Sequence, residues 1–277
     1  MAPIRKIFLL GTLGCAALCA AISSDFEKGA AQEKPKPAFP QYAQMPDVTA
    51  EPDITLEELL KKARSQLGDE KTLAAVRALE YVGQVEEADG KLRANLRHVY
   101  EKPYKLRRQE TQTNGQVGAI VLDEIDGWML LQQPGGELSK RSMPLNNKDF
   151  ERNLAVDKLN FFEGPKFFDN GELRFIGIVQ FGGKKAYRVD YAYPYVLLKM
   201  VLTRIFDAQT GRQMALISDR GRTQSIDSGV LEKDGIKFPK TTTIYRDGNV
   251  SMRINYEDII VNAQYPKTFF YEPKLVD

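Results

Sequence analysis

Residues 223–262 alternate between apolar and polar side chains, and two Asp-Gly pairs, Asp234-Gly235 and Asp247-Gly248, interrupt the alternation. An Asp-Gly pair between apolar runs is a strong hairpin signal, because both central residues of a type I′ turn need a positive φ. Every second residue of 250–257 is apolar, so this strand should have one buried and one solvated face. We therefore expect an antiparallel meander. A two-residue loop at Asp247 would set its register, with Tyr245 opposite Val250, Thr243 opposite Met252 and Thr241 opposite Ile254.

The same period of two recurs through most of the chain between residues 81 and 219. Turn-forming pairs such as Asn-Gly, Asp-Gly and Gly-Gly separate the alternating runs, as they do in sheets built from hairpins. The runs cover residues 81–87, 92–100, 104–113, 117–124, 127–133, 173–181, 186–193, 196–207 and 212–219. Together with the meander, they predict about eleven strands, each pairing with its neighbours in sequence.

Two stretches follow the helical period instead. Thr55-Leu56-Glu57-Glu58 fits a capping box, and an apolar stripe at helical spacing follows it. Residues 144–162 break the strand pattern, with Asn146 or Asn147 as the expected N-cap, and a shorter helical piece is expected at 73–79. The chain is therefore predicted to be mainly β with two principal helices (α+β). We expect a strongly curved antiparallel sheet, or unclosed β-barrel, whose concave face the helices cover.

The first 21 residues have the layout of a secretory signal peptide, with Arg5 and Lys6 before an apolar run and small residues at 19–21. The apolar run is shorter than the roughly 20 residues that a membrane-spanning helix needs. Residues 22–53 are rich in proline and charged residues, which indicates a flexible linker. Residues 54–277 are then expected to form a single β domain.

Both cysteines, Cys15 and Cys19, lie inside the signal, so a chain cleaved near Ile22 has no thiol for disulfides, catalysis or metal binding. Leu13-Gly14-Cys15-Ala16 resembles a bacterial lipobox, which gives the alternative of a chain lipidated at Cys15 and anchored to a membrane. The formal charge of +2 comes from Arg5 and Lys6, and without them acidic and basic residues are equal in number. A balanced charge offers no basic face for nucleic acid.

The sequence offers little for catalysis. His98 is the only histidine, so a Ser-His-Asp triad or a histidine metal site would depend on it alone. No Gly-x-Ser-x-Gly motif occurs, and Gly182-Gly183-Lys184-Lys185 does not have the spacing of a phosphate-binding loop. Carboxylate pairs such as Glu257-Asp258 are expected at turns or on solvated faces. We therefore expect no catalytic residue, no metal and no cofactor, and a hydrolase built on His98 is the least favoured alternative.

Several short motifs follow one another in a characteristic order: Pro103-Tyr104-Lys105-Leu106-Arg107, Asp126-Gly127-Trp128, Ala186-Tyr187-Arg188-Val189, Phe206-Asp207 with Thr210-Gly211, and the segment 234–239. With the signal and the amphipathic helix, this order resembles the periplasmic lipoprotein-sorting carriers and receptors of the LolA/LolB type. The resemblance covers residues 55–273 and implies an unclosed β-barrel, capped by helices, whose apolar cavity holds acyl chains. The long proline-rich arm and a segment inserted at 158–170 depart from that family and favour a relative with another ligand.

By this resemblance, seven residues are candidates for the cavity: Trp128, Leu130, Phe206, Met252, Ile254, Tyr256 and Arg107, the last matching the arginine of the family's proline-lysine-arginine strand. The resemblance also implies a non-enzymatic, periplasmic protein that binds a lipid, an acyl chain or another apolar ligand in lipid or lipoprotein transport. An envelope protein is a further expected partner, and we expect a monomer. The alternative is an assembly or scaffold protein of the cell envelope, in which the same sheet has a filled core and no ligand.

Overall fold

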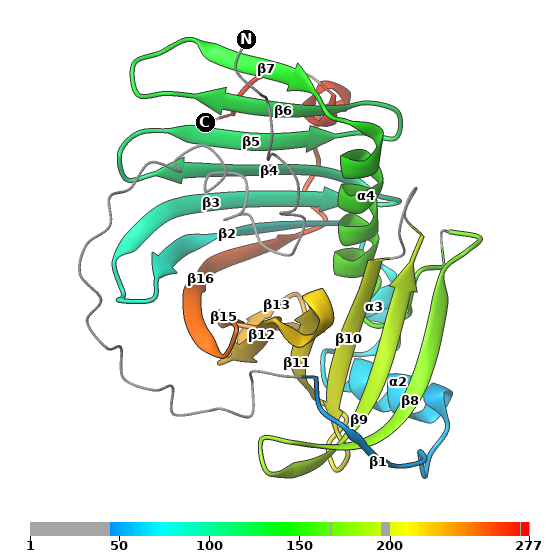
Figure 1. Ribbon diagram of the computed structural model, residues 1–277. Coiled ribbons are helices and arrows are strands. Elements are labelled where there is room, and N and C mark those ends of the chain that lie inside the picture. The colour runs from blue at the N-terminus through cyan, green and yellow to red at the C-terminus, as the bar shows by residue number, and fades with distance from the viewer. Residues whose placement is uncertain (1–44, 167, 195–199, 272, 277) are drawn as a thin grey trace, which may run out of the picture.

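The computed structural model describes residues 45–166, 168–194, 200–271 and 273–276 (Figure 1). The signal peptide expected at 1–21 and most of the linker expected at 22–53 lie outside these residues. Fourteen strands form one antiparallel sheet, and β13 (Leu231–Lys233) pairs with β14 (Ile236–Phe238) as a separate hairpin. The described chain is mainly β, and the class predicted from the sequence is confirmed.

Two runs of consecutive hairpins build the sheet. The first run consists of β2 (Ala78–Glu87), β3 (Leu92–Glu101), β4 (Lys105–Gln112), β5 (Val117–Leu122), β6 (Gly127–Gln132) and β7 (Leu138–Ser142). The second run consists of β8 (Glu172–Phe181), β9 (Lys184–Tyr193), β10 (Met200–Asp207), β11 (Gln213–Ser218), β12 (Thr223–Ser228), β15 (Thr241–Arg246) and β16 (Asn249–Val261). β16 pairs with β2 and joins the two runs. The prediction that every strand pairs only with its neighbours in sequence is therefore wrong at this point. β1 (Val48–Ala50) pairs with β8 at one edge, and β7 is the other edge.

In the described residues, three α-helices accompany the sheet: α2 (Leu56–Ser65), α3 (Glu70–Ala74) and α4 (Leu145–Leu159). α2 begins at the predicted capping box, in which the backbone N–H of Thr55 donates to Glu58 Oε2 at 2.8 Å and that of Glu58 donates to the Thr55 hydroxyl. α3 lies earlier than the short helix expected at 73–79, because Asp69 caps it and the chain is already extended at Ala78. The N-cap position of α4 is Pro144, not Asn146 or Asn147, because the chain is still extended at Pro144, with ψ 148°, and no side chain caps the helix.

The hairpin at Asp247-Gly248 forms as predicted, but its register differs. β15 and β16 pair Tyr245 with Val250 as expected, and then Ile244 with Met252 and Thr242 with Ile254. A β-bulge in β16 causes this shift, and one extra residue moves every later side chain to the other face. The predicted pairings of Thr243 and Thr241 are therefore wrong. The bulge places Ile244 beside Met252 on the buried face, where the expected register had placed a threonine.

The alternating pattern did not reveal β1 and β7, which are the two edges of the sheet. All residues of β1 and all but Leu138 of β7 are exposed. A strand with both faces in water has no apolar alternation for the sequence to display. β1 falls within the described end of the expected linker, so the sheet includes residues that the sequence assigned to a tether.

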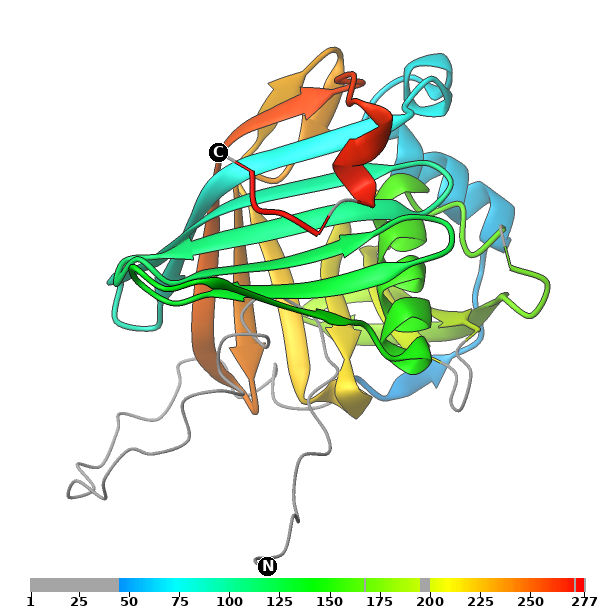
Figure 2. The same cartoon turned by 90° about the horizontal axis from the view of Figure 1, so that it is seen from above.

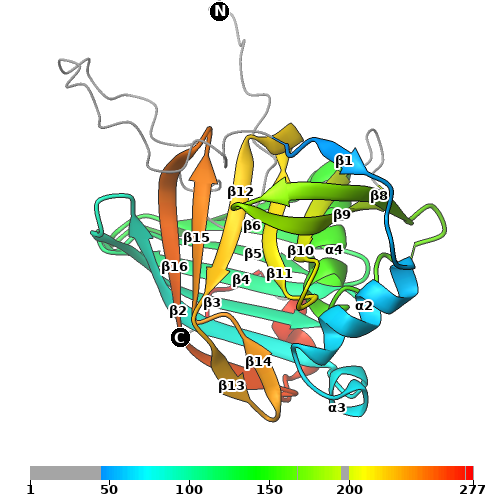
Figure 3. The same cartoon turned by 90° about the horizontal axis from the view of Figure 1, so that it is seen from below.

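The sheet is strongly curved and not closed, because its edge strands β1 and β7 are not paired with each other (Figures 1 and 3). α4 lies between the two runs and packs on β3, β4 and β5. We call the sheet face toward α4 the inner face. η3 (Lys267–Phe270) and the described residues 273–276 lie on the opposite, outer face of β3–β5 (Figure 2).

Two groups of buried side chains occupy the inner face. The first inner cluster joins β2–β5 with β14–β16, α3 and α4, and includes Leu79, Leu96, Leu106, Ile120, Leu122, Ala155, Leu159, Ile244, Met252 and Ile254. The second inner cluster joins β8–β11 with α2 and α4, and includes Leu59, Ala63, Val156, Tyr187, Tyr191, Leu202 and Phe206. α4 contributes to both clusters, so it forms part of the core of each run.

Gly83 of β2 lies in the strand pair that joins the two runs, so a substitution there tests how closely β2 and β16 are packed. A Cβ atom at this position would lie 2.2 Å from the carbonyl oxygen of Asn255 in β16. Gly83→Ala should therefore lower the free energy of unfolding by about 1–3 kcal/mol in urea denaturation, because backbone would have to move in the strand pair that links the runs. Gly136→Ala is the control and should stay within about 0.5 kcal/mol of the wild type, since no atom lies closer than 3.4 Å to its Cβ. Equal losses in the two variants would contradict this account.

Candidate functional site

Four of the seven residues predicted to line a cavity lie on the inner face. Met252 and Ile254 belong to the first inner cluster, each 9% exposed, and Tyr256 packs against that cluster. Phe206 is fully buried in the second inner cluster, where it meets the ring of Phe162 edge-on. The inner face therefore holds these four residues in two groups, with α4 between the groups.

The other three predicted residues, Trp128, Leu130 and Arg107, lie on the outer face. Arg107 and Trp128 both sit opposite Val121 in register, and Leu130 is buried with Val121 in a cluster separate from the inner ones. Arg107 is 1% exposed and donates hydrogen bonds to the backbone oxygens of Phe269 and Lys274 in the C-terminal segment. One inner cavity therefore cannot contain all seven residues. β6 is apolar on both faces, so the alternation of its sequence could not assign a face to Trp128.

α4 carries buried charges on a helix that is enclosed on most sides. Its buried residues include Glu151, Asn153 and Asp157 as well as Leu154, Ala155, Val156 and Leu159. Buried polar residues interrupt the buried apolar ones, so α4 has no single apolar stripe. Because isolated buried charges are costly, each carboxylate on this helix should have a partner on the sheet.

The two buried carboxylates of α4, Glu151 and Asp157, are each bound by an arginine from a different run of the sheet. Glu151 accepts a hydrogen bond at 2.6 Å from Arg108 of β4. Asp157 accepts hydrogen bonds from Arg204 of β10 and, at 2.7 Å, from the phenol of Tyr193 in β9. The side chains of both ion pairs are less than one-tenth exposed. α4 is thus held between the runs by charge at two points, besides its apolar contacts.

Two further ionisable groups lie on the inner face beside Arg108. His98 of β3 is opposite Arg108 in register, and its Nε2 is 3.7 Å from Glu110 Oε1 of β4. Burial lowers the pKa of His98, with Glu110 acting in the opposite direction, so the imidazole is neutral at pH 7. Burial also raises the pKa of Glu151, which Arg108 offsets only in part.

These polar groups were not predicted as site residues, although the sequence contained part of the signal. The alternation of β3 places His98 on the same face as Leu96, which indicates a buried histidine. The pairing of β4 with α4, which brings Arg108 to Glu151, joins residues far apart in the chain. The pattern of residues within a single strand or helix does not indicate such a contact.

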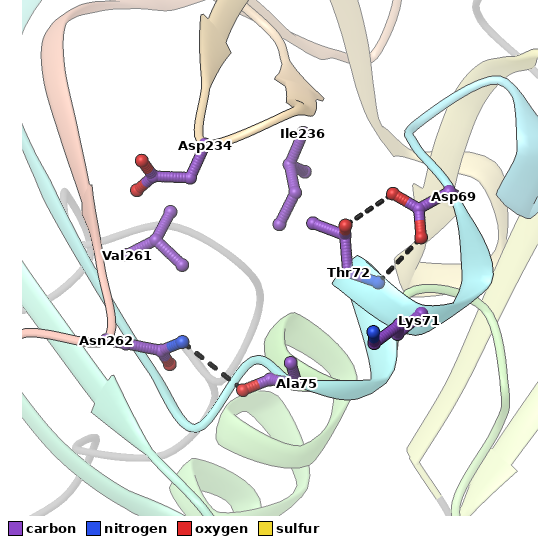
Figure 4. Close-up of a pocket in the computed structure, with 8 residues that line it drawn as sticks. All are labelled: Asp69, Lys71, Thr72, Ala75, Asp234, Ile236, Val261 and Asn262. Carbon is purple, nitrogen blue, oxygen red and sulfur yellow. Dashed lines mark hydrogen bonds between the residues drawn. The ribbon is translucent and has the colours of Figure 1, made fainter.

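A separate depression of about 500 Å³ lies between α3, the β13–β14 hairpin and the end of β16 (Figure 4). Its lining consists of Asp69, Lys71, Thr72, Ala75, Asp234, Ile236, Val261 and Asn262. Asp69 caps α3 through Thr72, and Asn262 holds the backbone of Arg77, Ala78 and Ala75. Much of the polar lining therefore serves local structure, which disfavours this depression as a specific site.

The described residues hold neither a cluster of metal ligands nor a membrane-spanning helix. No group of three or more histidine, cysteine or acidic side chains in those ranges is placed to hold a metal ion. No helix in the described part of the chain is long and apolar enough to cross a bilayer.

Solved structures share this fold, whereas no family model and no curated protein matches the sequence. A LolA superfamily protein from Nitrosomonas europaea superposes with a TM-score of 0.51 at 12% identity, covering 79% of this chain and 98% of that one. A putative outer membrane lipoprotein-sorting protein domain from Vibrio parahaemolyticus also has a TM-score of 0.51 and 12% identity, with coverages of 78% and 97%. The chain therefore has a LolA-like fold, as the resemblance of its motifs predicted.

The ion pair between Arg204 and Asp157 should be important for stability, because both groups are buried. Arg204→Met would leave the Asp157 carboxylate with the phenol of Tyr193 as its remaining hydrogen-bond donor, so the free energy of unfolding should fall by about 3–5 kcal/mol in urea denaturation. Arg222→Met is the control: Arg222 pairs with Asp247 in water, and its loss should cost at most about 1 kcal/mol. Similar losses in both variants would show that α4 is not held by this buried pair.

The buried His98 should make the folded state sensitive to acid. Its folded pKa lies below its unfolded value, so the unfolded chain binds more protons and the free energy of unfolding falls as the pH drops below about 6.5. Compared with His98→Asn, the wild type should lose stability on acidification with a slope of at most about 1.4 kcal/mol per pH unit. The nearby charges Glu110, Arg108 and Lys158 are the same in both proteins. Parallel curves in urea denaturation between pH 7 and pH 5 would contradict a buried neutral imidazole.

Proposed function

We propose that this protein is a non-enzymatic carrier that holds a lipid, an acyl chain or another apolar ligand against the inner face of its unclosed sheet. The observation that supports this proposal is the position of α4, which lies over the apolar inner face but is attached to the sheet partly by ion pairs. Charged groups, unlike apolar ones, are well solvated once they reach water, so α4 is suited to act as a lid that moves away and uncovers the clusters beneath it. Met252, Ile254, Tyr256 and Phe206 are the residues expected to contact the ligand.

The comparisons favour a ligand of this class. The structure from Vibrio parahaemolyticus is described as a putative outer membrane lipoprotein-sorting protein domain, and its fold covers most of this chain. We infer that the present protein works in the periplasm, after export by the signal at 1–21 and with residues 22–53 as a tether. Its partner would then be a lipid or the acyl chain of a lipoprotein, with an envelope protein as a further partner. Lipidation at Cys15 remains the alternative route to the membrane.

A second function is an assembly or scaffold protein of the cell envelope, and one observation favours it. Met252 and Ile254 are 9% exposed and Phe206 is fully buried, so these inner residues are already covered in this state of the protein. A scaffold would keep that filled core at all times. A carrier would open it, so the two functions differ in whether an apolar ligand gains access.

Met252→Ala distinguishes the two functions. In a carrier, an environment-sensitive fatty-acid probe binds the wild type saturably, competing lipid displaces it, and Met252→Ala changes the affinity for the probe more than it changes thermal stability. Met214→Ala is the matched control, because Met214 packs on an outer-face cluster that includes Val179 and Ile217. If the wild type binds no probe and Met252→Ala loses the roughly 2–5 kcal/mol expected of a filled core, the scaffold function is correct.

A further inference from the structure

Four ionisable side chains meet among apolar residues on the inner face. They are His98 of β3, Arg108 and Glu110 of β4, and Glu151 of α4, and each is at most 9% exposed. Arg108 and Glu110 are two residues apart on one strand and so point to the same face, and His98 lies opposite Arg108. Residues of the first inner cluster lie opposite both β4 side chains, namely Leu96 opposite Glu110 and Ile120 opposite Arg108.

Two carboxylate oxygens in this group accept no hydrogen bond. Glu151 binds Arg108 through Oε1, while its buried Oε2 has no donor. Glu110 Oε1 is also buried without a donor, because His98 Nε2, at 3.7 Å, is beyond hydrogen-bond distance. A buried acceptor without a donor destabilises the folded state. Two such atoms on a face that is otherwise apolar are an arrangement that a bound donor would satisfy.

The charges of the group do not balance. Arg108 pairs with Glu151, and His98 is neutral because burial lowers its pKa, so among the described residues the carboxylate of Glu110 forms no ion pair with a lysine or an arginine. Lys158, two turns after Glu151 on α4, is a further cation near His98, and it is exposed. Water screens an exposed ammonium from a buried carboxylate, so Lys158 compensates Glu110 only weakly.

We propose that Glu110 and Glu151 bind the head of an amphiphilic ligand, and that this head is a positively charged hydrogen-bond donor such as a primary amine. The inference rests on the proposed function, because the apolar chain of the ligand would lie along the first inner cluster. An ammonium group has three N–H donors and one positive charge, so it satisfies the free oxygens and balances Glu110. A carboxylate head would add a like charge, and a hydroxyl head would supply a donor but no charge.

Three ligands that differ only in their heads test the proposal: dodecylamine, dodecanol and dodecanoic acid. The measurement is the concentration of each ligand that displaces a neutral environment-sensitive alkyl probe from the full chain at pH 7. All three ligands are kept at concentrations at which they are dissolved as single molecules. Dodecylamine should displace the probe at a concentration about tenfold lower than dodecanol, because a hydrogen bond to a charged group contributes that much, and dodecanoic acid should be the weakest. Glu110→Gln should remove most of the advantage of the amine and leave dodecanol unchanged. Glu257→Gln, at an exposed position of β16, should keep the order of the wild type.

The outcomes separate this inference from the function on which it rests. Equal binding of the three heads, or preference for dodecanoic acid, would overturn the inference while the carrier function stands, and the latter result would assign the head to Lys158. If neither the probe nor dodecanol binds, the carrier function fails and the inference fails with it. Should circular dichroism show that Glu110→Gln does not fold, the order of the three heads on the wild type still decides, and Glu151→Gln is the second variant.

Discussion

Two buried arginine–carboxylate pairs organise this molecule, because they fix the one helix that both halves of the sheet share. Arg108 binds Glu151 from the first run, and Arg204 binds Asp157 from the second. Within the sheet, the two runs are connected only where β16 pairs with β2. Without α4, the inner faces of the two runs would be separated and exposed to solvent. With α4 between them, both faces have a common apolar partner in Ala155, Val156 and Leu159. The position of α4 therefore decides whether the inner face is a core or a surface.

A buried ion pair is a selective way to attach such a helix. Replacing both partners by apolar groups often leaves stability unchanged or improves it, so these pairs are not explained by stability alone. They specify which turn of α4 meets which strand, since a shift by one residue would leave two charges buried without partners. An apolar seam would tolerate such shifts. The attachment can still be reversed by moving the whole helix off the sheet, because water then solvates the charges of both partners.

Local features of the fold were readable from the sequence, and long-range ones were not. The capping box at Thr55 and the turn at Asp247-Gly248 each act within a few residues, and both formed as predicted. The bulge in β16 and the pairing of β16 with β2 depend on contacts between distant segments, for which the alternation of side chains gives no signal. The candidate site divides in the same way. Met252 was placed on the inner face by its own strand pattern, whereas Arg107 was placed by analogy and lies on the other side.

An unclosed sheet has two free edge strands that must be protected from pairing with other chains, whereas a closed barrel has none. A closed barrel has no free strand edge, but this sheet ends in β1 and β7, and exposed edges can pair with another copy and polymerise. β7 presents Lys140 and Arg141, whose charges repel a second copy of the same edge. β1 covers the edge of β8 with only three residues, which is too short a template for stable pairing. The end of the linker therefore protects the protein from self-association, besides joining it to whatever precedes it.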